Sequence, residues 1–297
     1  MNHEQSLKVL ICNFESLNTP SGVASYAVKL LRRLPCLAAL TTRNAFHTPL
    51  EEREVNLESK TLYNEILWMP WAGLRTMCRK VREADLIHLN PFNFTELILP
   101  AIAKACGKRS IAVMHSNINA HLLTPTIALE MARLIIVYNI MLLAVDRIVF
   151  LSQAHYENYR TYSLWKKRFR GKGVIIPNAV ESGRILAERK PVEAKPLTCI
   201  FVGRFERRKG ADDLLALAEQ LQGEEIRFLA VGFDPGQLPK SLRNVTVLGR
   251  VDNETLFDYY DKSHIYLMPS HSEAFGITIL EAMARGLVIL SSDIPGM

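Results

Sequence analysis

Short apolar runs alternate with segments of helical periodicity along this chain, and no other feature restricts the fold as much. Five runs in the first half carry apolar residues on both faces, at 7–12, 85–89, 109–115, 147–151 and 173–177. Segments with helical periodicity lie between them at 22–34, 95–106 and about 125–145. Strands that are apolar on both faces and alternate with helices are typical of a parallel sheet covered by helices on both sides.

The alternation stops at residues 181–196 and then starts again. This stretch combines a charge cluster with two prolines and has little apolar periodicity, as a linker would. After it, strands are predicted at 197–204, 226–232, 245–250, 265–270 and 287–292, and helices at 210–222, 252–261 and 276–285. We therefore expect an α/β protein with two Rossmann-like domains, 1–183 and 197–297, joined by a linker at 184–196. Ligands of open α/β sheets bind beyond the carboxyl ends of the strands, which predicts a site in a cleft between two such domains.

Composition excludes several classes of protein. The 297 residues, 48% hydrophobic and 22% charged, suit two globular domains. Five scattered cysteines without a C-x-x-C pair argue against a disulfide framework or a zinc site. The N-terminus lacks the features of a signal peptide. The most apolar stretch, 134–151, is interrupted by Asn139, Asp146 and Arg147, so we expect a buried helix running into a strand rather than a membrane span, and a cytoplasmic location.

The charge is unevenly distributed. Residues 1–190 contain 25 Lys and Arg against 15 Asp and Glu, a net charge of +10, whereas residues 191–297 contain 11 against 15, a net charge of −4. A basic first half suits an anionic partner such as a phospholipid surface, a lipid-phosphate acceptor or nucleic acid, and equally a solvated face without a partner. No recognition motif supports nucleic acid. Residues 163–173 (SLWKKRFRGKG) interleave aromatic and cationic side chains, as a membrane interface or a plain basic loop would.

The segment VGRFERRKG (202–210) is the first candidate site. It follows a predicted strand and opens a helix, with Arg204 just after the strand and Lys209 at the helix entry. Two cations and unpaired helix amides at a strand end suit a phosphate or diphosphate. A basic surface loop without a ligand would show the same residue pattern. Neither the G-x-G-x-x-G fingerprint nor the G-x-x-x-x-G-K-[ST] loop occurs, which argues against NAD-linked chemistry and P-loop phosphoryl transfer.

The second candidate is PSHSEAFGITILEAMARG (269–286). Glu273 lies in the loop after a strand, and Glu281 lies eight residues later, near the same face of the following helix. Between them, Ala274, Phe275 and Gly276 lead the backbone into the helix and offer amide donors to an anion or a sugar hydroxyl. Carboxylates so placed can bind sugar and ribose hydroxyls. The alternative is a helix-capping carboxylate beside a solvated glutamate.

The two motifs, in this order, resemble the retaining glycosyltransferases of the GT-B architecture, glycosyl transferases group 1, whose pattern E-x-F-G-x-x-x-x-E matches Glu273, Phe275, Gly276 and Glu281. IIPNAVE (175–181) resembles the segment "IPNGVD" of that family, and VFLSQ (149–153) resembles the strand before it. NTPSGVASYAVKLLRRL (18–34) resembles its glycine-rich first loop, where only Gly22 remains of two adjacent glycines. AVMHS (112–116) places His115 where the family has a histidine at a strand end.

The resemblance implies a role for each residue. Arg204 and Lys209 neutralise the leaving diphosphate, Glu281 holds the ribose, Glu273 contacts the donor sugar, and His115 hydrogen-bonds that sugar near the reacting carbon. The first loop, with Gly22, approaches the diphosphate, and the backbone of Ala274, Phe275 and Gly276 completes the donor site. Fixed cations aimed at the β-phosphate stabilise the departing charge, so neither a divalent metal nor another cofactor is expected.

We thus expect transfer of a sugar, with retention, from a UDP- or GDP-sugar to a glycan or lipid-linked acceptor, with membrane contact through the basic first domain. The alternative is a non-catalytic relative that binds donor or partner as a scaffold. In the family, a further strand and C-terminal helices follow the segment SSDIPGM (291–297), so we also expect the second domain to be incomplete here.

Overall fold

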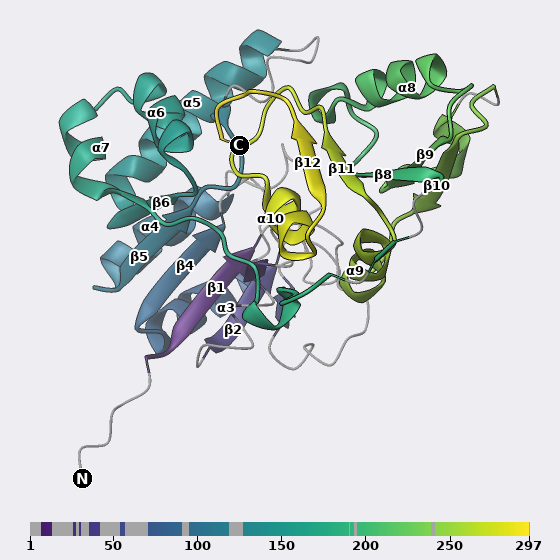
Figure 1. The fold of residues 1–297 in the computed structure, drawn as a ribbon. Coiled ribbons are helices and arrows are strands. Elements are labelled where there is room, and N and C mark those ends of the chain that lie inside the picture. Colours follow the sequence, from purple (N-terminus) through teal and green to yellow (C-terminus); the bar gives the residue numbers. More distant parts are fainter. Residues whose placement is uncertain are drawn as a thin grey trace. The chain divides into compact units, whose positions relative to one another are not determined.

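The computed structural model describes residues 7–13, 26, 27, 30, 36–41, 54–56, 71–90, 95–118, 127–189, 191, 192, 195–238 and 241–296 (Figure 1). The chain forms two compact units. Unit 1 comprises Met1–Asn119 and Thr126–Ile176, and unit 2 comprises Ala120–Pro125 and Pro177–Met297.

Unit 1 contains a parallel sheet of seven strands in the order β3-β2-β1-β4-β5-β6-β7. The strands are β1 (Val9–Asn13), β2 (Cys36–Thr41), β3 (Glu54–Asn56), β4 (Leu86–Asn90), β5 (Arg109–Val113), β6 (Arg147–Phe150) and β7 (Gly173–Ile175). The helices are α3 (Trp71–Glu83), α4 (Thr95–Ala105), α5 (Ile127–Ala144), α6 (Gln153–Tyr162) and α7 (Lys166–Lys172). The strand order changes direction between β1 and β4, and ligands of such sheets bind at this kind of switch point.

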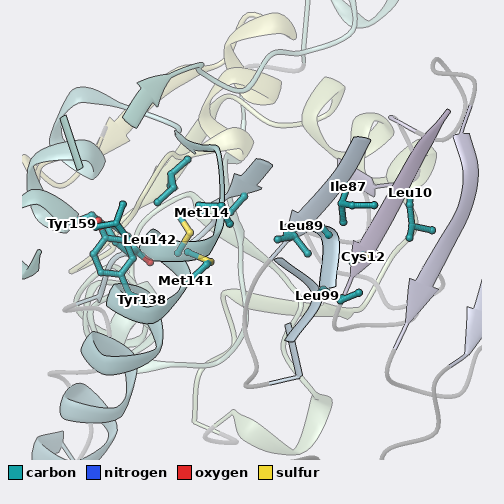
Figure 2. Packing of buried hydrophobic residues seen from close by; sticks show 14 of the residues in the cluster. Leu10, Cys12, Ile87, Leu89, Leu99, Met114, Tyr138, Met141, Leu142 and Tyr159 are labelled. Atoms are coloured by element: carbon teal, nitrogen blue, oxygen red, sulfur yellow. The ribbon is translucent and has the colours of Figure 1, made fainter. Parts of the chain in front are cut away.

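The core of unit 1 lies on both faces of its sheet. Leu10, Ile87 and Leu89 of β1 and β4 belong to one cluster with Tyr138, Met141 and Leu142 of α5 (Figure 2). Alternate residues of β1, Val9 and Ile11, point to the other face and pack with Ala27. Strands buried on both sides need this doubly apolar pattern, which is why the sequence of β1 shows no alternation.

Unit 2 contains a parallel sheet of five strands in the order β10-β9-β8-β11-β12. The strands are β8 (Leu197–Val202), β9 (Ile226–Val231), β10 (Val245–Gly249), β11 (Ile265–Met268) and β12 (Val288–Ser291), and the α-helices are α8 (Ala211–Gln220), α9 (Asn253–Asp261) and α10 (Ile277–Ala284). Three short 3-10 helices are η3 (Ser182–Arg184), η4 (Arg207–Lys209) and η5 (Pro235–Gln237). The switch point of this sheet lies between β8 and β11.

Two separate apolar clusters cover the two faces of the unit 2 sheet. Ile200 of β8 packs with Phe257 and Tyr260 of α9, whereas its neighbour Phe201 packs with Leu214 of α8. Figure 1 shows α8 on one side of the sheet and α9 and α10 on the other. The predicted α/β class with two Rossmann-like parallel sheets is therefore confirmed.

The predicted strands and the later helices agree with the structure to within a few residues at their ends. The elements β2, β3, α3, α6 and α7 were not predicted. Helix α6, QAHYENYRTY, is mostly polar and buries only His155 and Tyr159, so its apolar periodicity is weak. Of the helix predicted at 22–34, residues 26, 27 and 30 are helical and the others lie outside the described residues.

The apolar stretch 134–151 forms the end of α5 and then β6, as expected, but the helix is not buried throughout. Ile136 and Ile140 of α5 are 55% and 46% exposed. Within the described ranges, no helix is long and apolar enough to cross a membrane.

Residues 182–189, which include the start of the predicted linker, belong to unit 2 and are held against its helices. Arg184 forms a salt bridge with Glu254, and its guanidinium lies 4.7 Å from the ring centroid of Phe257. Arg189 donates to the carbonyl oxygens of Gly286 and Ser263. Charged side chains that have fixed partners in this way bind the segment to α9 and to the end of α10.

Candidate functional site

The loops that follow β8 and β11 meet at the switch point of unit 2. Gly210, which precedes α8, has a φ of 73°, and a Cβ atom there would lie 2.0 Å from the carbonyl oxygen of Pro269. The backbone N–H of His271 donates to the carbonyl of Arg208 at 2.8 Å. Only glycine allows so close an approach of two backbones at a left-handed position. The contact joins the two sequence motifs of unit 2 into one site.

Lys209 and Glu273 form an ion pair across this junction. The Glu273 side chain is 9% exposed and that of Lys209 is 22% exposed. The Ser270 hydroxyl donates to the same carboxylate at 3.3 Å. The two residues, 64 positions apart in the sequence, are thus brought together as a partly buried charged pair at the carboxyl edge of the sheet.

Arg204 lies in the same loop as Lys209 and pairs with a different carboxylate, that of Glu206. Its Nη1 lies 2.9 Å from Oε1 of Glu206, and its side chain is 66% exposed. The other carboxylate oxygen of Glu206 lies 3.4 Å from Nη2 of Arg208. Arg208 also donates from its Nη1 to the carbonyl oxygen of Ser272 at 3.4 Å. Glu206 therefore bridges two arginines, one exposed and one held against the loop after β11.

Glu281 lies about one turn from the start of α10, close to buried tyrosines. Burial raises the pKa of Tyr260 well above its usual value, and the neighbouring Tyr266 and the Glu281 carboxylate raise it further. Tyr266 donates to the hydroxyl of Thr278, in the first turn of α10, at 2.6 Å. Burial also raises the pKa of Tyr266, and the carboxylates of Glu273 and Glu281 add to this shift. Tyr266 thus lies near both glutamates of the predicted pair.

The backbone between the glutamates enters α10 as predicted. Ala274 is 5% exposed and Phe275 is half-buried. Gly276 occupies the N-cap position of α10, where no side chain caps the helix. A Cβ atom on Gly276 would lie 3.1 Å from Cδ1 of Ile279, so the turn is tightly packed.

His115 of unit 1 follows β5 and contacts the end of β4. Its Nε2 lies 3.0 Å from Oδ1 of buried Asn90, and since that oxygen only accepts, Nε2 carries the proton. The ring of Tyr26 meets His115 edge-on, with centroids 5.0 Å apart, and the Tyr26 hydroxyl lies 3.2 Å from Nε2 of His88. These side chains gather near the β1–β4 switch point of the first sheet.

Helix α6 holds the loop that carries His115. Nε2 of His155 and the hydroxyl of Tyr159 both donate to the carbonyl of Ser116, at 3.1 and 2.9 Å. Oδ1 of Asn158 accepts from the backbone N–H of Ile118 at 3.0 Å. One face of α6 therefore fixes the backbone directly after His115.

Two buried histidines, His88 and His155, and the half-buried His115 lie in this region of unit 1. Burial lowers the pKa of His115 to about 3, with further lowering by His88 and His155. Burial lowers the pKa of His88 and of His155 to about 4, partly offset by backbone hydrogen bonds. All three rings are consequently neutral near pH 7.

The structure joins some of the predicted residues and not others. Lys209 and Glu273 are in contact, and Glu281 shares the tyrosine cluster with Glu273. His115 belongs to unit 1, and Gly22 lies outside the described residues. Sequence reasoning missed Glu206, Arg208, Tyr266 and Asn90. Glu206 and Arg208 stand inside the motif VGRFERRKG, but the spacing did not indicate which charges pair. In the part of the chain that the structure describes, no group of His, Cys, Asp and Glu is arranged to hold a metal ion.

Comparison with known proteins supplies a family. The model of the family "Glycosyl transferases group 1" matches residues 184–297. The D-rhamnosyltransferase WbpZ of Pseudomonas aeruginosa is 30% identical over 231 residues, which are 71% of this chain and 56% of that protein. The gpi3 subunit of the phosphatidylinositol N-acetylglucosaminyltransferase of Schizosaccharomyces pombe is 29% identical over 133 residues, 41% of this chain and 29% of that protein. The chain therefore spans less than two thirds of these relatives.

Solved structures supply the fold. Anabaena Alr3699/HepE, in complex with UDP and glucose, matches with a TM-score of 0.75 and 15% identity, covering 98% of this chain and 82% of that one. A likeness at this identity concerns the fold alone, and it shows that the chain has the GT-B fold.

The contact between Gly210 and Pro269 leads to a first prediction. Gly210→Ala forces an L-residue into the left-handed region, at about 1–2 kcal/mol, and pushes Cβ against a carbonyl oxygen. The free energy of unfolding, from urea denaturation, should fall by at least that amount. Gly223→Ala, where a Cβ atom meets nothing within 4 Å, is the matched control. Equal effects of the two substitutions would contradict the close junction.

These three histidines lead to a second prediction. Their pKa values are lowered in the folded state, to about 3 for His115 and about 4 for His88 and His155, whereas the unfolded value is about 6.5. The unfolded chain then binds more protons at acidic pH, so the stability from these groups is present above about pH 6.5 and declines as the pH falls toward 4. Histidine NMR signals assigned with His→Gln variants should not titrate between pH 8 and 5.5. Titration of any of the three near 6.5 would show that its ring is solvated.

Proposed function

The chain belongs, through residues 184–297, to the glycosyl transferases group 1 family, and we propose that it transfers a sugar, with retention, from a nucleoside-diphosphate sugar to a glycan or lipid-linked acceptor. The observation that carries the proposal is the meeting of Lys209 and Glu273 at the β8–β11 switch point. A cation for a diphosphate and a carboxylate for a sugar hydroxyl stand side by side there, beyond the carboxyl ends of the strands.

In this proposal unit 2 binds the donor. Arg204 and Lys209 bind the diphosphate, together with the amides that open α8, and they stabilise negative charge as the nucleoside diphosphate departs. Glu281 accepts hydrogen bonds from the ribose hydroxyls, and Glu273 contacts the sugar. The backbone of Ala274, Phe275 and Gly276 supplies further amides. Because side-chain cations serve the diphosphate, transfer is expected to continue in EDTA.

The first domain, 1–183, serves the acceptor side in this proposal. The linker at 184–196 connects it to the donor domain, 197–297. His115 hydrogen-bonds the donor sugar near the reacting carbon. Its ring is neutral and held by Asn90, which suits a hydrogen-bonding role better than that of a charged group. Gly22 belongs to the loop proposed to approach the diphosphate. The UDP and glucose bound to the Anabaena structure favour UDP-glucose as the first donor to test.

The donor site is tested by calorimetry with UDP and GDP. Arg204→Ala or Lys209→Ala should each weaken binding by about 1.5–3 kcal/mol, the usual contribution of a charge-assisted hydrogen bond. Glu281→Gln should also weaken binding of the free nucleotide. Glu273→Gln should weaken binding of the sugar-bearing donor only, since this substitution leaves Lys209 available for phosphate. Lys262→Ala, at the far end of α9, is the control. Unchanged affinity in both cation variants would exclude the phosphate role.

A non-catalytic scaffold is the alternative function. It would bind the nucleotide sugar without releasing nucleoside diphosphate, in the presence or absence of acceptors. An enzyme should release UDP or GDP from at least one nucleotide sugar of a panel, and this release should be lost in Glu273→Gln. A scaffold should bind the nucleotide sugar and release neither.

The membrane contact is proposed at the turn between α6 and α7. Leu164 and Trp165 are 72% and 41% exposed there, and Lys167, Arg168 and Arg170 are exposed beside them. The ammonium groups of Lys166 and Lys172 instead donate to the backbone carbonyls that end α6 and α5, so these two cations serve the fold. Exposed apolar side chains flanked by exposed cations suit an anionic membrane face. We place the protein in the cytoplasm, at the inner face of the membrane, and assign no role to nucleic acid.

Sedimentation with vesicles tests this surface. Binding to phosphatidylcholine vesicles that contain phosphatidylglycerol is expected, and Arg168→Gln should weaken it about fivefold, since a cation near an anionic surface contributes about 1 kcal/mol. Arg82→Gln removes the same charge from the exposed end of α3 and should have a smaller effect. Equal loss in both variants would indicate attraction by net charge rather than by this turn.

A further inference from the structure

The cations of the donor site are balanced by carboxylates of the same site. Arg204 pairs with Glu206 and Lys209 pairs with Glu273. The two carboxylates differ in their surroundings, because Glu273 is 9% exposed and Glu206 is 34% exposed. Glu273 also stands where the donor sugar is proposed to bind. Glu206 has no such role, and its charge is opposite to the one that a diphosphate site requires.

Glu206 holds its two arginines in unequal ways. Arg208 is 23% exposed and is also bonded to the carbonyl of Ser272, so it is fixed on its other side. Arg204 is 66% exposed, and its guanidinium pairs with the Glu206 carboxylate. If Arg204 turns away, Glu206 keeps Arg208 as a partner. The exposed arginine is therefore the movable member of this bridge.

We propose that Glu206 is an internal competitor of the donor diphosphate: it pairs with Arg204 and releases this arginine to the nucleotide when the nucleotide binds. The inference rests on the proposed function, since it assumes that Arg204 binds phosphate. A carboxylate and a diphosphate that share one guanidinium also repel each other, so the charge of Glu206 lowers affinity for nucleoside diphosphates. Glu206 is in this sense a specificity-determining residue for the charge of the ligand and favours release of the diphosphate product.

The local backbone does not depend on the Glu206 charge. Glu206 is the N-cap residue of η4, but its side chain makes no capping hydrogen bond. A glutamine at this position has the same shape, and its amide oxygen can still accept from Arg208. Glu206→Gln thus removes the competing charge while leaving the loop in place.

Calorimetry with UDP and GDP on the full chain tests the inference. Glu206→Gln should tighten binding of the nucleotide about two- to fivefold at low salt, the range expected for an exposed ion pair. The gain should shrink as salt rises from about 10 mM to about 1 M, because exposed charges are then screened. Glu219→Gln removes the same charge at the other end of α8 and is the matched control, expected to change affinity less.

The double variant Arg204→Ala/Glu206→Gln isolates the competition for Arg204. If Glu206 acts mainly through Arg204, Glu206→Gln should bring a clearly smaller gain when Arg204 is already absent, because only the direct repulsion of the diphosphate is then relieved. A gain of the same size in the Arg204→Ala background would overturn the inference, as would equal or weaker binding by Glu206→Gln alone. Failure of the unchanged chain to bind UDP or GDP would contradict the proposed function as well, whereas normal binding without a gain would contradict this inference only.

Discussion

The candidate site of unit 2 depends on one backbone contact, the approach of Gly210 to the carbonyl oxygen of Pro269. It brings the loop after β8 against the loop after β11, and the hydrogen bond between His271 and Arg208 secures it. Lys209 directly precedes Gly210 and Glu273 follows Pro269 by four residues, so the ion pair between them forms at this same junction. The site is thus a consequence of close main-chain packing at a switch point, to which the charged side chains are added.

The sheets could be predicted because burial on both faces leaves a strong trace in the sequence. Strands such as β8 are apolar at consecutive positions, and Ile200 and Phe201 indeed enter different clusters on opposite faces. Helix α6 left no such trace, because its function in the fold is carried by polar atoms. His155, Asn158 and Tyr159 hold the backbone after His115 through hydrogen bonds, and hydrogen-bond partners cannot be derived from apolar periodicity.

The site residues could be predicted as types but not as partners. Spacing and resemblance indicated Arg204, Lys209, Glu273 and Glu281, since cations and carboxylates at strand ends carry a recognisable chemistry. The pairing of each charge is a property of three-dimensional distance. A motif with Arg204, Glu206, Arg207, Arg208 and Lys209 in six positions permits many ion pairs, and only the path of the chain through η4 and into Gly210 selects among them.

The residues near the switch points of the two units differ in charge, although both units have the same kind of parallel sheet. In unit 2 the charges are kept and paired internally, Arg204 with Glu206 and Lys209 with Glu273. In unit 1 the residues near the switch point are kept neutral by burial, and their orientation comes from hydrogen bonds such as that from His115 to Asn90. A neutral imidazole can still both donate and accept hydrogen bonds, so the hydrogen-bonding role proposed for His115 requires no charged ring.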